Sequence, residues 1–314
     1  RSARSRVRTG QVAAMNDHDR GNDHVTVVIP ARNAAATLAA QLRALDAQLG
    51  DVTFSVVVVD NGSTDDTATV ARGHRSDRYS LRVVDEVNAG VNWARNAGIA
   101  AARDGLVLLC DADDEVRPGW VSAMAAACEP RTWVGGVVDY AALNSPRTRL
   151  QWGAPVVSSV VEAGPTAEGE PYADRTFGCA CGFHRSMWEE LGGFDHRLSG
   201  IGGDETEFFT RAHAAGYRPR AVPAAVVAYR LRPGVVNMCR QRFRQGRQQV
   251  RWLAIAGDSN RPLLPDRPTT RRALVKVVVA APRYLWSARA RYQWMASVSR
   301  HLGRLTGDRA LAGG

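Results

Sequence analysis

Short apolar segments alternate with segments of helical periodicity through the first third of the chain. The apolar segments are nearly continuous and occupy residues 25–29, 54–59, 81–84 and 106–110. Leucines at positions 38, 42 and 45 follow the spacing of one helix face, and a further helix is predicted over residues 91–102. Continuous apolar strands joined by helices are typical of βαβ units. The pattern therefore predicts an α/β fold with a Rossmann-like, mostly parallel central sheet flanked by helices on both faces.

The pattern changes after about residue 133. Shorter segments at 134–143, 150–156 and 176–185 have the pattern of an antiparallel or mixed sheet; helices are expected at 185–191 and 205–215, and a last strand within 222–233. Residues 237–257 and 271–305 have the pattern of basic amphipathic helices, separated by a Pro-containing linker at 258–268. We expect a disordered leader over 1–23, one globular domain over 24–232 and a basic helical extension over 233–314.

The chain carries a formal net charge of +10, and this excess is local. From residue 230 onward there are 17 Arg and one Lys against three Asp, so the rest of the chain is slightly acidic. A basic extension attached to a slightly acidic domain is as typical of binding to an anionic substrate or a membrane surface as it is of binding to RNA. The five cysteines are odd in number and scattered, which favours reduced thiols and a cytoplasmic setting. No apolar run approaches the roughly 20 residues that cross a bilayer.

Polar side chains follow each predicted strand of the first third, and the carboxyl ends of parallel strands share one edge of the sheet. After the fourth strand come Asp111, Asp113, Asp114 and Glu115. In extended geometry Asp111 and Asp113 converge while Asp114 points elsewhere. Converging carboxylates are costly unless a cation lies between them, which predicts a Mg²⁺ or Mn²⁺ site that also holds a diphosphate. A solvated acidic turn or a helix N-cap is the alternative.

Five sequence motifs occur in the order and spacing of a known family. They are VTVVIPARNAAATL, VVVVDNGSTDDT, NAGVNWARNAGIAAA, LLCDADDEVRPGW and LGGFDHRLSGIGGDETEFFTRAHAAGY. Together they resemble the family-2 glycosyltransferases of the GT-A fold, over about residues 25–232, roughly two thirds of the chain. The resemblance implies a GT-A fold, a nucleotide-diphosphate sugar donor and an acceptor hydroxyl.

The resemblance also assigns roles to residues at matching positions. Asp111 and Asp113 match the D-x-D motif, with Asp113 as the direct metal ligand and Asp111 nearer the ribose or sugar. Asp204 and Glu205 match the acidic pair whose second member acts as the catalytic base. The nucleotide-binding residues would be Pro30, Arg32, Asn33, Asp60, Asn88, Arg95 and Asp111.

Two positions depart from the family pattern. Position 205 is Glu where the family has Asp, so the choice between Asp204 and Glu205 as base stays open, and we favour Glu205. Together with Glu207, these residues also fit an acidic helix N-terminus. Many relatives have a metal-assisting His after the last strand, where this chain has Ala228, which implies weak metal affinity.

One base and one metal suit a single displacement with inversion at the anomeric carbon. A glycosidase would instead need two carboxylates that flank the scissile bond. The sequence lacks the P-loop pattern and the dinucleotide-binding glycine pattern. Two rivals remain: an RNA- or anionic-surface-binding protein that uses the basic extension, and a sugar nucleotidyltransferase, whose usual Gly-rich loop and signature lysine are absent here. We expect no nucleic-acid partner.

The extension contains QQVRW, which fits the Q-x-x-R-W pattern of processive glycan synthases, although chance explains this match equally well in an Arg- and Gln-rich segment. We treat Arg251 and Trp252 as candidate acceptor contacts. Aromatic residues interleaved with Arg near position 290 are compatible with peripheral contact at a membrane, and also with packing inside the extension. Cys179 and Cys181 with His184 form a poor zinc pattern, so a buried strand of small residues is the interpretation for them.

Overall fold

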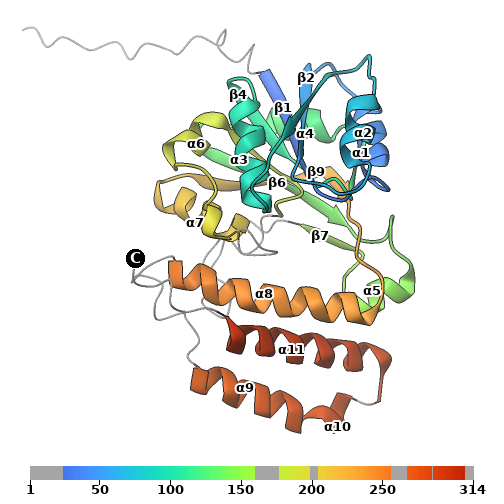
Figure 1. Cartoon of the computed structure of the whole chain (residues 1–314), viewed down its shortest axis with the longest axis vertical. Helices are drawn as coiled ribbons and strands as arrows, with labels where there is room; N and C mark the ends of the chain where they lie inside the picture. Colours follow the sequence, from blue (N-terminus) through green and yellow to red (C-terminus); the bar gives the residue numbers. More distant parts are fainter. Residues whose placement is uncertain (1–23, 160–176, 199–203, 256–266, 285, 308–314) are drawn as a thin grey trace, which may run out of the picture.

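The computed structural model describes residues 24–159, 177–198, 204–255, 267–284 and 286–307. Within these ranges the strands form one sheet in the order β3-β2-β1-β4-β8-β6-β9-β5, and β7 pairs with β6 beside this path (Figure 1). The strands are β1 His24–Ala31, β2 Phe54–Asp60, β3 Ser80–Asp85, β4 Gly105–Leu109, β5 Glu115–Val116, β6 Thr132–Asp139, β7 Val157–Ser159, β8 Cys181–His184 and β9 Arg218–Ala228.

The first four long strands are parallel, as predicted. β1 pairs in parallel with β2 and β4, and β2 with β3. The register places Ala31 beside Asp60 and Asp60 beside Asp85, so these strands end at one edge of the sheet. β8 is antiparallel to both β4 and β6, while β6 and β9 are parallel, which makes the second half mixed. The predicted α/β fold with a mostly parallel first half is confirmed.

Helices cover both faces of the sheet. The helices of the domain are α1 Leu38–Asp46, α2 Thr67–Gly73, α3 Val91–Ala101, α4 Trp120–Ala127, α5 Pro146–Trp152, α6 Arg185–Glu190 and α7 Asp204–Ala214. One apolar cluster joins α1 and α4 to Val27 and Ile29 of β1, and a second joins α3, α6 and α7 to Val28. Successive residues of one strand thus enter opposite cores, as the pleat requires. Gly98 lets α3 approach the sheet, because a Cβ there would overlap the Val28 side chain.

Residues 150–156 are not the short strand that their pattern suggested. Residues 150–152 are the last residues of helix α5, and residues 153–156 follow it. The N-cap of this helix, Ser145, accepts a hydrogen bond from the Thr148 N–H. Pro146 stands in the first helical turn, and Gly153 ends the helix at a φ of 62°. These are the ordinary helix start and stop signals. A helix of only seven residues is too short to show clear helical periodicity. The apolar residues of the segment therefore suggested a strand.

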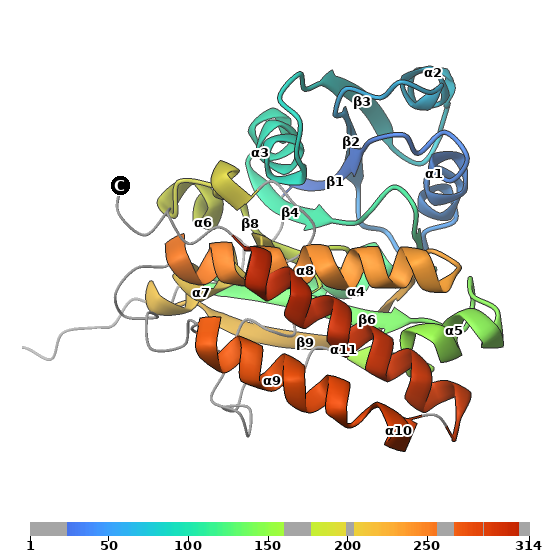
Figure 2. The same cartoon turned by 60° about the horizontal axis from the view of Figure 1, so that its bottom comes forward.

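The C-terminal residues form helices, as predicted, and Figures 1 and 2 show them as a layer of their own beside α5. They are α8 Val235–Ile255, α9 Arg267–Val279, α10 Ala281–Tyr284 and α11 Ala288–Thr306. The segment 271–305 is therefore divided among three helices. The expected leader, residues 1–23, and most of the expected linker lie outside the described residues. In the described part of the chain, no helix has both the length and the hydropathy to span a membrane.

Candidate active site

The loops after β1, β2 and β3 are tied to one another by side-chain amides. Asn33, which has a φ of 51°, accepts a hydrogen bond of 2.8 Å from the Thr64 N–H, and its own N–H donates to the Ser63 hydroxyl. The buried Asn61 donates to the Asn88 carbonyl at 2.6 Å and accepts from the Gly90 N–H at 2.8 Å. Sequence analysis assigned Asn33 and Asn88 to the nucleotide. The structure shows that Asn61, which had no role, positions the third loop.

The strand-end cluster consists of Asp111, Asp114 and Cys179. One ligand atom from each lies within 4.8 Å of the other two. β4 ends at Leu109, and residues 112–114 form a turn instead of continuing the strand. The turn overturns the expectation that Asp114 points away, since residues at positions i and i+3 of a turn approach each other.

Asp114 is 1% exposed, and its Oδ1 accepts a hydrogen bond of 2.8 Å from the Arg230 N–H. Burial raises the pKa of Asp114 well above its usual value, and the nearby Asp111 and Asp113 raise it further. Its second oxygen, Oδ2, is buried and has no hydrogen-bond partner in the described part of the chain. A buried carboxylate oxygen without a partner, next to a second carboxylate, is the environment that a hard divalent cation stabilises.

Asp113 is partly buried, and burial raises its pKa, while the positive charges of Arg232 and Arg230 act in the opposite direction. Arg230 also donates from Nε to the Asp113 carbonyl at 3.0 Å and forms an ion pair of 3.2 Å with Glu115. Two arginines from the end of β9 thus face the acidic turn. Arg230 is 117 residues from Asp113 in the chain, so no local pattern predicts this contact.

Gln41 of α1 fixes the backbone of the acidic turn. Its side chain is fully buried, donates to the Asp111 carbonyl at 3.1 Å and accepts from the Val116 N–H at 3.0 Å. A glutamine on an apolar helix face is unfavourable unless buried backbone groups satisfy it. Gln41 thereby holds both ends of the segment that carries the carboxylates.

Cys179 was expected to lie in a buried strand of small residues. It is buried, just before β8, and its thiol lies beside the carboxylates. Burial raises the pKa of Cys179 well above its usual value, as do the charges of Asp114, Asp111 and, more weakly, Glu205. A protonated thiol is a poor ligand for Mg²⁺ or Mn²⁺, which prefer oxygen donors. The oxygens of the cluster therefore fit such a cation and the sulfur does not.

Glu205 lies in the first turn of α7 and acts on Cys179 electrostatically, which brings it to the side of the strand-end cluster. The side chain of Asp204 lies outside the described residues. Glu207 has a different role: it is 6% exposed and pairs with Arg211 at 2.5 Å within the helix. Glu205 is thus an acidic residue of this helix whose charge acts on the cluster.

The other predicted nucleotide contacts lie at the strand ends or in the core next to them. Arg32 is exposed and Pro30 is partly buried at the end of β1. Asp60 is the last residue of β2, and its Oδ1 accepts from the Ser63 N–H at 3.4 Å. Arg95 is only 4% exposed, with its guanidinium 5.5 Å from the centre of the Phe194 ring. Packing encloses the Arg95 side chain. Arg95 therefore differs from a solvent-accessible arginine that binds phosphate.

Arg251 and Trp252 lie near the end of α8. Trp252 is 6% exposed and packs against Leu198 and Ile255. Leu198 closes the short 3-10 turn that precedes α7. The Q-x-x-R-W segment is thus next to the chain that leads into Glu205, even though its tryptophan is buried.

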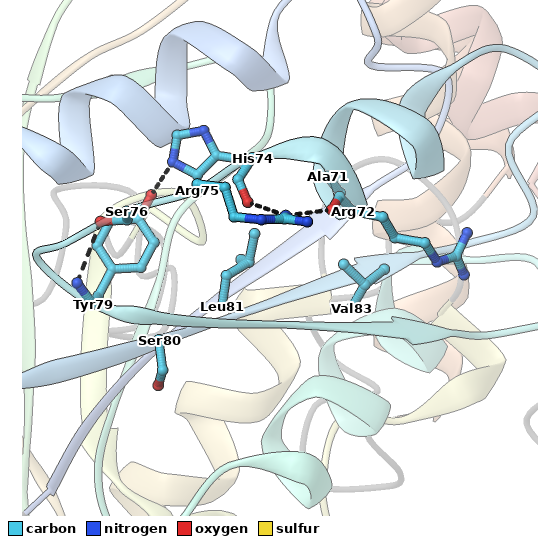
Figure 3. Close-up of a pocket in the computed structure, with 9 residues that line it drawn as sticks. All are labelled: Ala71, Arg72, His74, Arg75, Ser76, Tyr79, Ser80, Leu81 and Val83. Atoms are coloured by element: carbon cyan, nitrogen blue, oxygen red, sulfur yellow. Dashed lines mark hydrogen bonds between the residues drawn. The ribbon is translucent and has the colours of Figure 1, made fainter.

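The larger of two described cavities, about 530 Å³, lies elsewhere, between α2 and the edge strand β3 (Figure 3). Its polar side chains have partners of their own. Arg72 pairs with Asp85 at 2.6 Å, His74 lies 3.0 Å from the Tyr79 hydroxyl, and Arg75 donates to two backbone carbonyls. Because these groups already have partners, this cavity has the character of a surface recess and not of a catalytic site.

The family comparison agrees with the fold. The model described as glycosyl transferase family 2 matches residues 26–192, more than half of the chain. The chain belongs to glycosyl transferase family 2, a family of transferase enzymes. A second model, described as the N-terminal domain of galactosyltransferase, matches residues 166–233.

Sequence relatives of this family-2 member match it over limited stretches. The succinoglycan biosynthesis protein ExoO of Rhizobium meliloti is 43% identical over 94 residues, which cover 30% of this chain and 26% of that protein. An uncharacterized glycosyltransferase of Mycobacterium tuberculosis is 39% identical over 104 residues, 33% of this chain and 43% of that protein. The matched part of the chain thus spans less than half the length of each of these relatives.

Solved structures extend the likeness to most of the chain. The mannosyltransferase PcManGT from Pyrobaculum calidifontis, in complex with GDP-Man and Mn²⁺, has a TM-score of 0.60 at 22% identity and covers 90% of this chain and 87% of its own. GalNAc-T7 with UDP, GalNAc and Mn²⁺ has a TM-score of 0.57 at 16% identity, over 88% of this chain and 55% of its own. At these identities the likeness establishes the GT-A fold.

Proposed function

We propose that this family-2 member transfers a sugar from a nucleotide-diphosphate donor to an acceptor hydroxyl, with inversion at the anomeric carbon. The observation that carries the proposal is the strand-end cluster itself. Asp111 and Asp114 are held together by a buried turn, and Glu205 approaches them from α7. Carboxylates in this arrangement are a stability cost that a bound cation offsets.

The donor nucleotide would lie along the ends of β1, β2 and β3, where the loops are linked by Asn33 and Asn61. We assign Pro30, Arg32 and Asn33 to the nucleoside and Asp60 to its base or ribose. Asn88, Arg95 and Asp111 border the rest of the nucleotide. The parallel strands favour this place because ligands of such sheets bind beyond the carboxyl ends of the strands.

A divalent cation, Mn²⁺ or Mg²⁺, would be held by Asp113 and Asp111, and the partnerless Oδ2 of Asp114 fits the same ion. PcManGT and GalNAc-T7 carry Mn²⁺ together with a nucleotide or nucleotide sugar, which supports the assignment. When bound, the cation would neutralise charge on the diphosphate. Arg230 and Arg232, whose charges act on Asp113, would add positive potential on the same side.

Glu205 would accept the proton of the incoming hydroxyl. A single base and a neutralised leaving group suit direct displacement, in which the hydroxyl attacks opposite the departing diphosphate. Asp204 remains the alternative base. Arg251 and Trp252, next to the chain that enters α7, would contribute to acceptor binding. We place the acceptor among glycans, lipid carriers and natural products; ExoO, named for succinoglycan biosynthesis, favours a glycan.

We divide the chain into a catalytic domain over 24–232 and a helical extension over 233–314, and propose that the extension contacts an anionic membrane peripherally. Val275, Val279 and Trp286 are 59%, 72% and 91% exposed. Residues 267–307 contain nine basic and no acidic residues. Exposed apolar side chains among basic residues are typical of interfacial helices. Trp294 takes no part, because its indole N–H donates to the Val277 carbonyl at 2.8 Å.

Thermal melting with UDP, GDP and dTDP, each with and without Mn²⁺, tests the proposal. We expect one nucleotide to raise the melting temperature only when Mn²⁺ is present, because the cation links the carboxylates to the diphosphate. The same nucleotide should leave Asp113→Asn unchanged. A wild-type protein that none of the nucleotides stabilises, with or without metal, would overturn the proposed donor site.

A further inference from the structure

A second cavity, of about 330 Å³, is lined by residues of α5, α8 and α11 and by Gly153. Figure 2 shows these three helices close to one another. Three arginines line the cavity: Arg242 from α8, and Arg300 and Arg304 from α11. None of the lining residues in the described part of the chain is acidic. Like charges repel strongly in a partly enclosed space, so the cavity gathers positive charge without a counter-charge of its own.

Arg242 shows the consequence of this crowding. Burial lowers the pKa of Arg242, and the neighbouring Arg300 lowers it further. The guanidinium lies 5.6 Å from the centre of the Trp152 ring and donates from one Nη to the Gln245 side chain at 3.1 Å. Its Nε is buried without a hydrogen-bond partner in the described part of the chain. A buried donor without an acceptor is costly, which indicates a missing acceptor.

The residues on α11 form a single polar stripe. Gln293, Ser297, Arg300 and Arg304 recur at intervals of three and four residues and therefore share one face. Arg300 and Arg304 are like charges at positions i and i+4, a pair that destabilises an isolated helix. Placing this face against α5 and α8 adds to that repulsion.

Close helix packing holds the arginines together despite the repulsion. A Cβ on Gly246 of α8 would overlap the Arg300 carbonyl, and a Cβ on Gly303 of α11 would overlap the Phe243 carbonyl. The two helix backbones thus approach at two glycines, Gly246 one turn after Arg242 and Gly303 between Arg300 and Arg304. The cavity is accordingly fixed by packing, and its charge is not needed to hold the helices in place.

We propose that this cavity binds a phosphate ester through Arg242, Arg300 and Arg304. Guanidinium groups match phosphate oxygens with paired N–H donors, and a phosphate dianion neutralises more of the three charges than a carboxylate does. The Ser297 hydroxyl and the Gln293 amide line the same cavity and add neutral donors. The volume exceeds that of a phosphate alone, and Trp152 provides an apolar wall for the esterified group.

None of the described residues that line this cavity belongs to the strand-end cluster or to the proposed nucleotide contacts. A tyrosine pair packs both against the apolar cluster of Trp152 and against the core cluster that contains Cys179. The rings of Tyr140 and Tyr229 pack edge to face with centres 5.4 Å apart. Both tyrosines are within electrostatic range of Asp114, and both act on Arg242. The phosphate ester is therefore an anion additional to the donor diphosphate, and its binding does not require the proposed transfer reaction.

Calorimetric titration of the full chain with glycerol 3-phosphate tests this site. We expect Arg300→Gln to weaken binding at least tenfold, while Arg289→Gln, an equal charge change on an exposed part of α11, binds like wild type. Asp113→Asn should also bind like wild type, which separates this cavity from the donor site. Arg300→Gln removes charge repulsion among the three arginines, so its melting temperature without ligand should equal or exceed that of wild type. A melting temperature in that range would show that the variant is folded.

Equal weakening by Arg300→Gln and Arg289→Gln would overturn the proposal, as would acetate binding as tightly as glycerol 3-phosphate. Vesicles distinguish the source of the phosphate. If glycerol 3-phosphate displaces the wild-type protein from phosphatidylglycerol vesicles, and Arg300→Gln binds those vesicles more weakly, the ester belongs to a lipid headgroup. If both vesicle measurements are unaffected while the calorimetric difference persists, the ester is a soluble molecule.

Discussion

The carboxylate of Asp114 accepts a hydrogen bond of 2.8 Å from the backbone N–H of Arg230. This bond joins the acidic turn after β4 to the end of β9, 116 residues later in the chain. It fixes one oxygen of Asp114 and leaves the other beside Asp111. The acidic turn is therefore a rigid arrangement set by distant segments, which is what a metal site requires of its ligands.

Asp113→Asn removes one proposed metal ligand and keeps the side-chain size. We expect sugar transfer to fall at least roughly 100-fold, because metal contacts at the transition state are worth several kcal/mol. Initial rates with the donor identified by thermal melting, together with a Mn²⁺ titration, measure this loss. Burial raises the pKa of Asp113, so the neutral Asn should not lower the melting temperature.

Asp77→Asn is the matched control for this change, since Asp77 is exposed and outside the site. It should retain the wild-type rate and the wild-type response to Mn²⁺. Transfer by Asp113→Asn at a rate close to that of this control would remove Asp113 from the metal site.

Glu205→Gln tests the assignment of the catalytic base. General-base catalysis contributes about 10²–10⁴-fold, so kcat should fall by that order while the affinity for the donor nucleotide stays unchanged. The measurements are kcat at saturating acceptor and the nucleotide dissociation constant. Asp204→Asn provides the comparison: if it lowers kcat more than Glu205→Gln does, the base is Asp204.

The fold was largely predictable because its strands and helices are strongly patterned. Val25 to Ile29 and Phe54 to Val59 are apolar runs interrupted only by Thr26 and Ser55, and each forms a central parallel strand. α5 was missed because its seven residues are mixed in pattern, and only its caps, Ser145 and Gly153, mark it as a helix. Short elements depend on capping more than on periodicity.

The site was predictable in its residue types and less so in its geometry. The position of Asp111 at a strand end followed from the pattern, but the turn that brings Asp114 back to it did not. Gln41 contacts Asp111 across 70 residues and Arg230 contacts Asp114 across 116. Such contacts depend on the packed fold and leave no local trace in the sequence.

The cysteines give a prediction about access to the site. Cys110, Cys179 and Cys181 are buried, whereas Cys128 and Cys239 are partly exposed. Burial raises the pKa of Cys179, so its reactive thiolate is scarce at about pH 8. We expect iodoacetamide to modify Cys179 at least about tenfold more slowly than Cys239, as mapped by peptide mass spectrometry, and unfolding to remove the difference. Rapid modification of Cys179 in the folded protein would show that the strand-end cluster is open.

Two buried glutamines, Gln41 in α1 and Gln48 just after it, allow stability and function to be separated. Gln41 binds the Asp111 carbonyl and the Val116 N–H, as described above. Gln48, two turns later, donates to the Arg117 carbonyl at 2.9 Å and accepts from the Val121 N–H at 3.0 Å. Both hold the backbone after β4, but only Gln41 holds the residue that carries a proposed ligand.

Gln41→Leu and Gln48→Leu should therefore destabilise the fold to a similar extent and differ in their effect on binding. Each leaves one buried N–H, that of Val116 or Val121, without its acceptor and removes one donor from a backbone carbonyl. The unpaired N–H costs roughly 1–3 kcal/mol, which urea unfolding measures. Gln41→Leu should in addition weaken Mn²⁺-dependent nucleotide binding by about 10–100-fold, the usual loss when the support of a metal ligand is removed. Gln48→Leu should bind like wild type at temperatures where it is folded. If both variants lose binding equally, the acidic turn responds to overall stability, and the Gln41 contact with Asp111 has no specific role in the site.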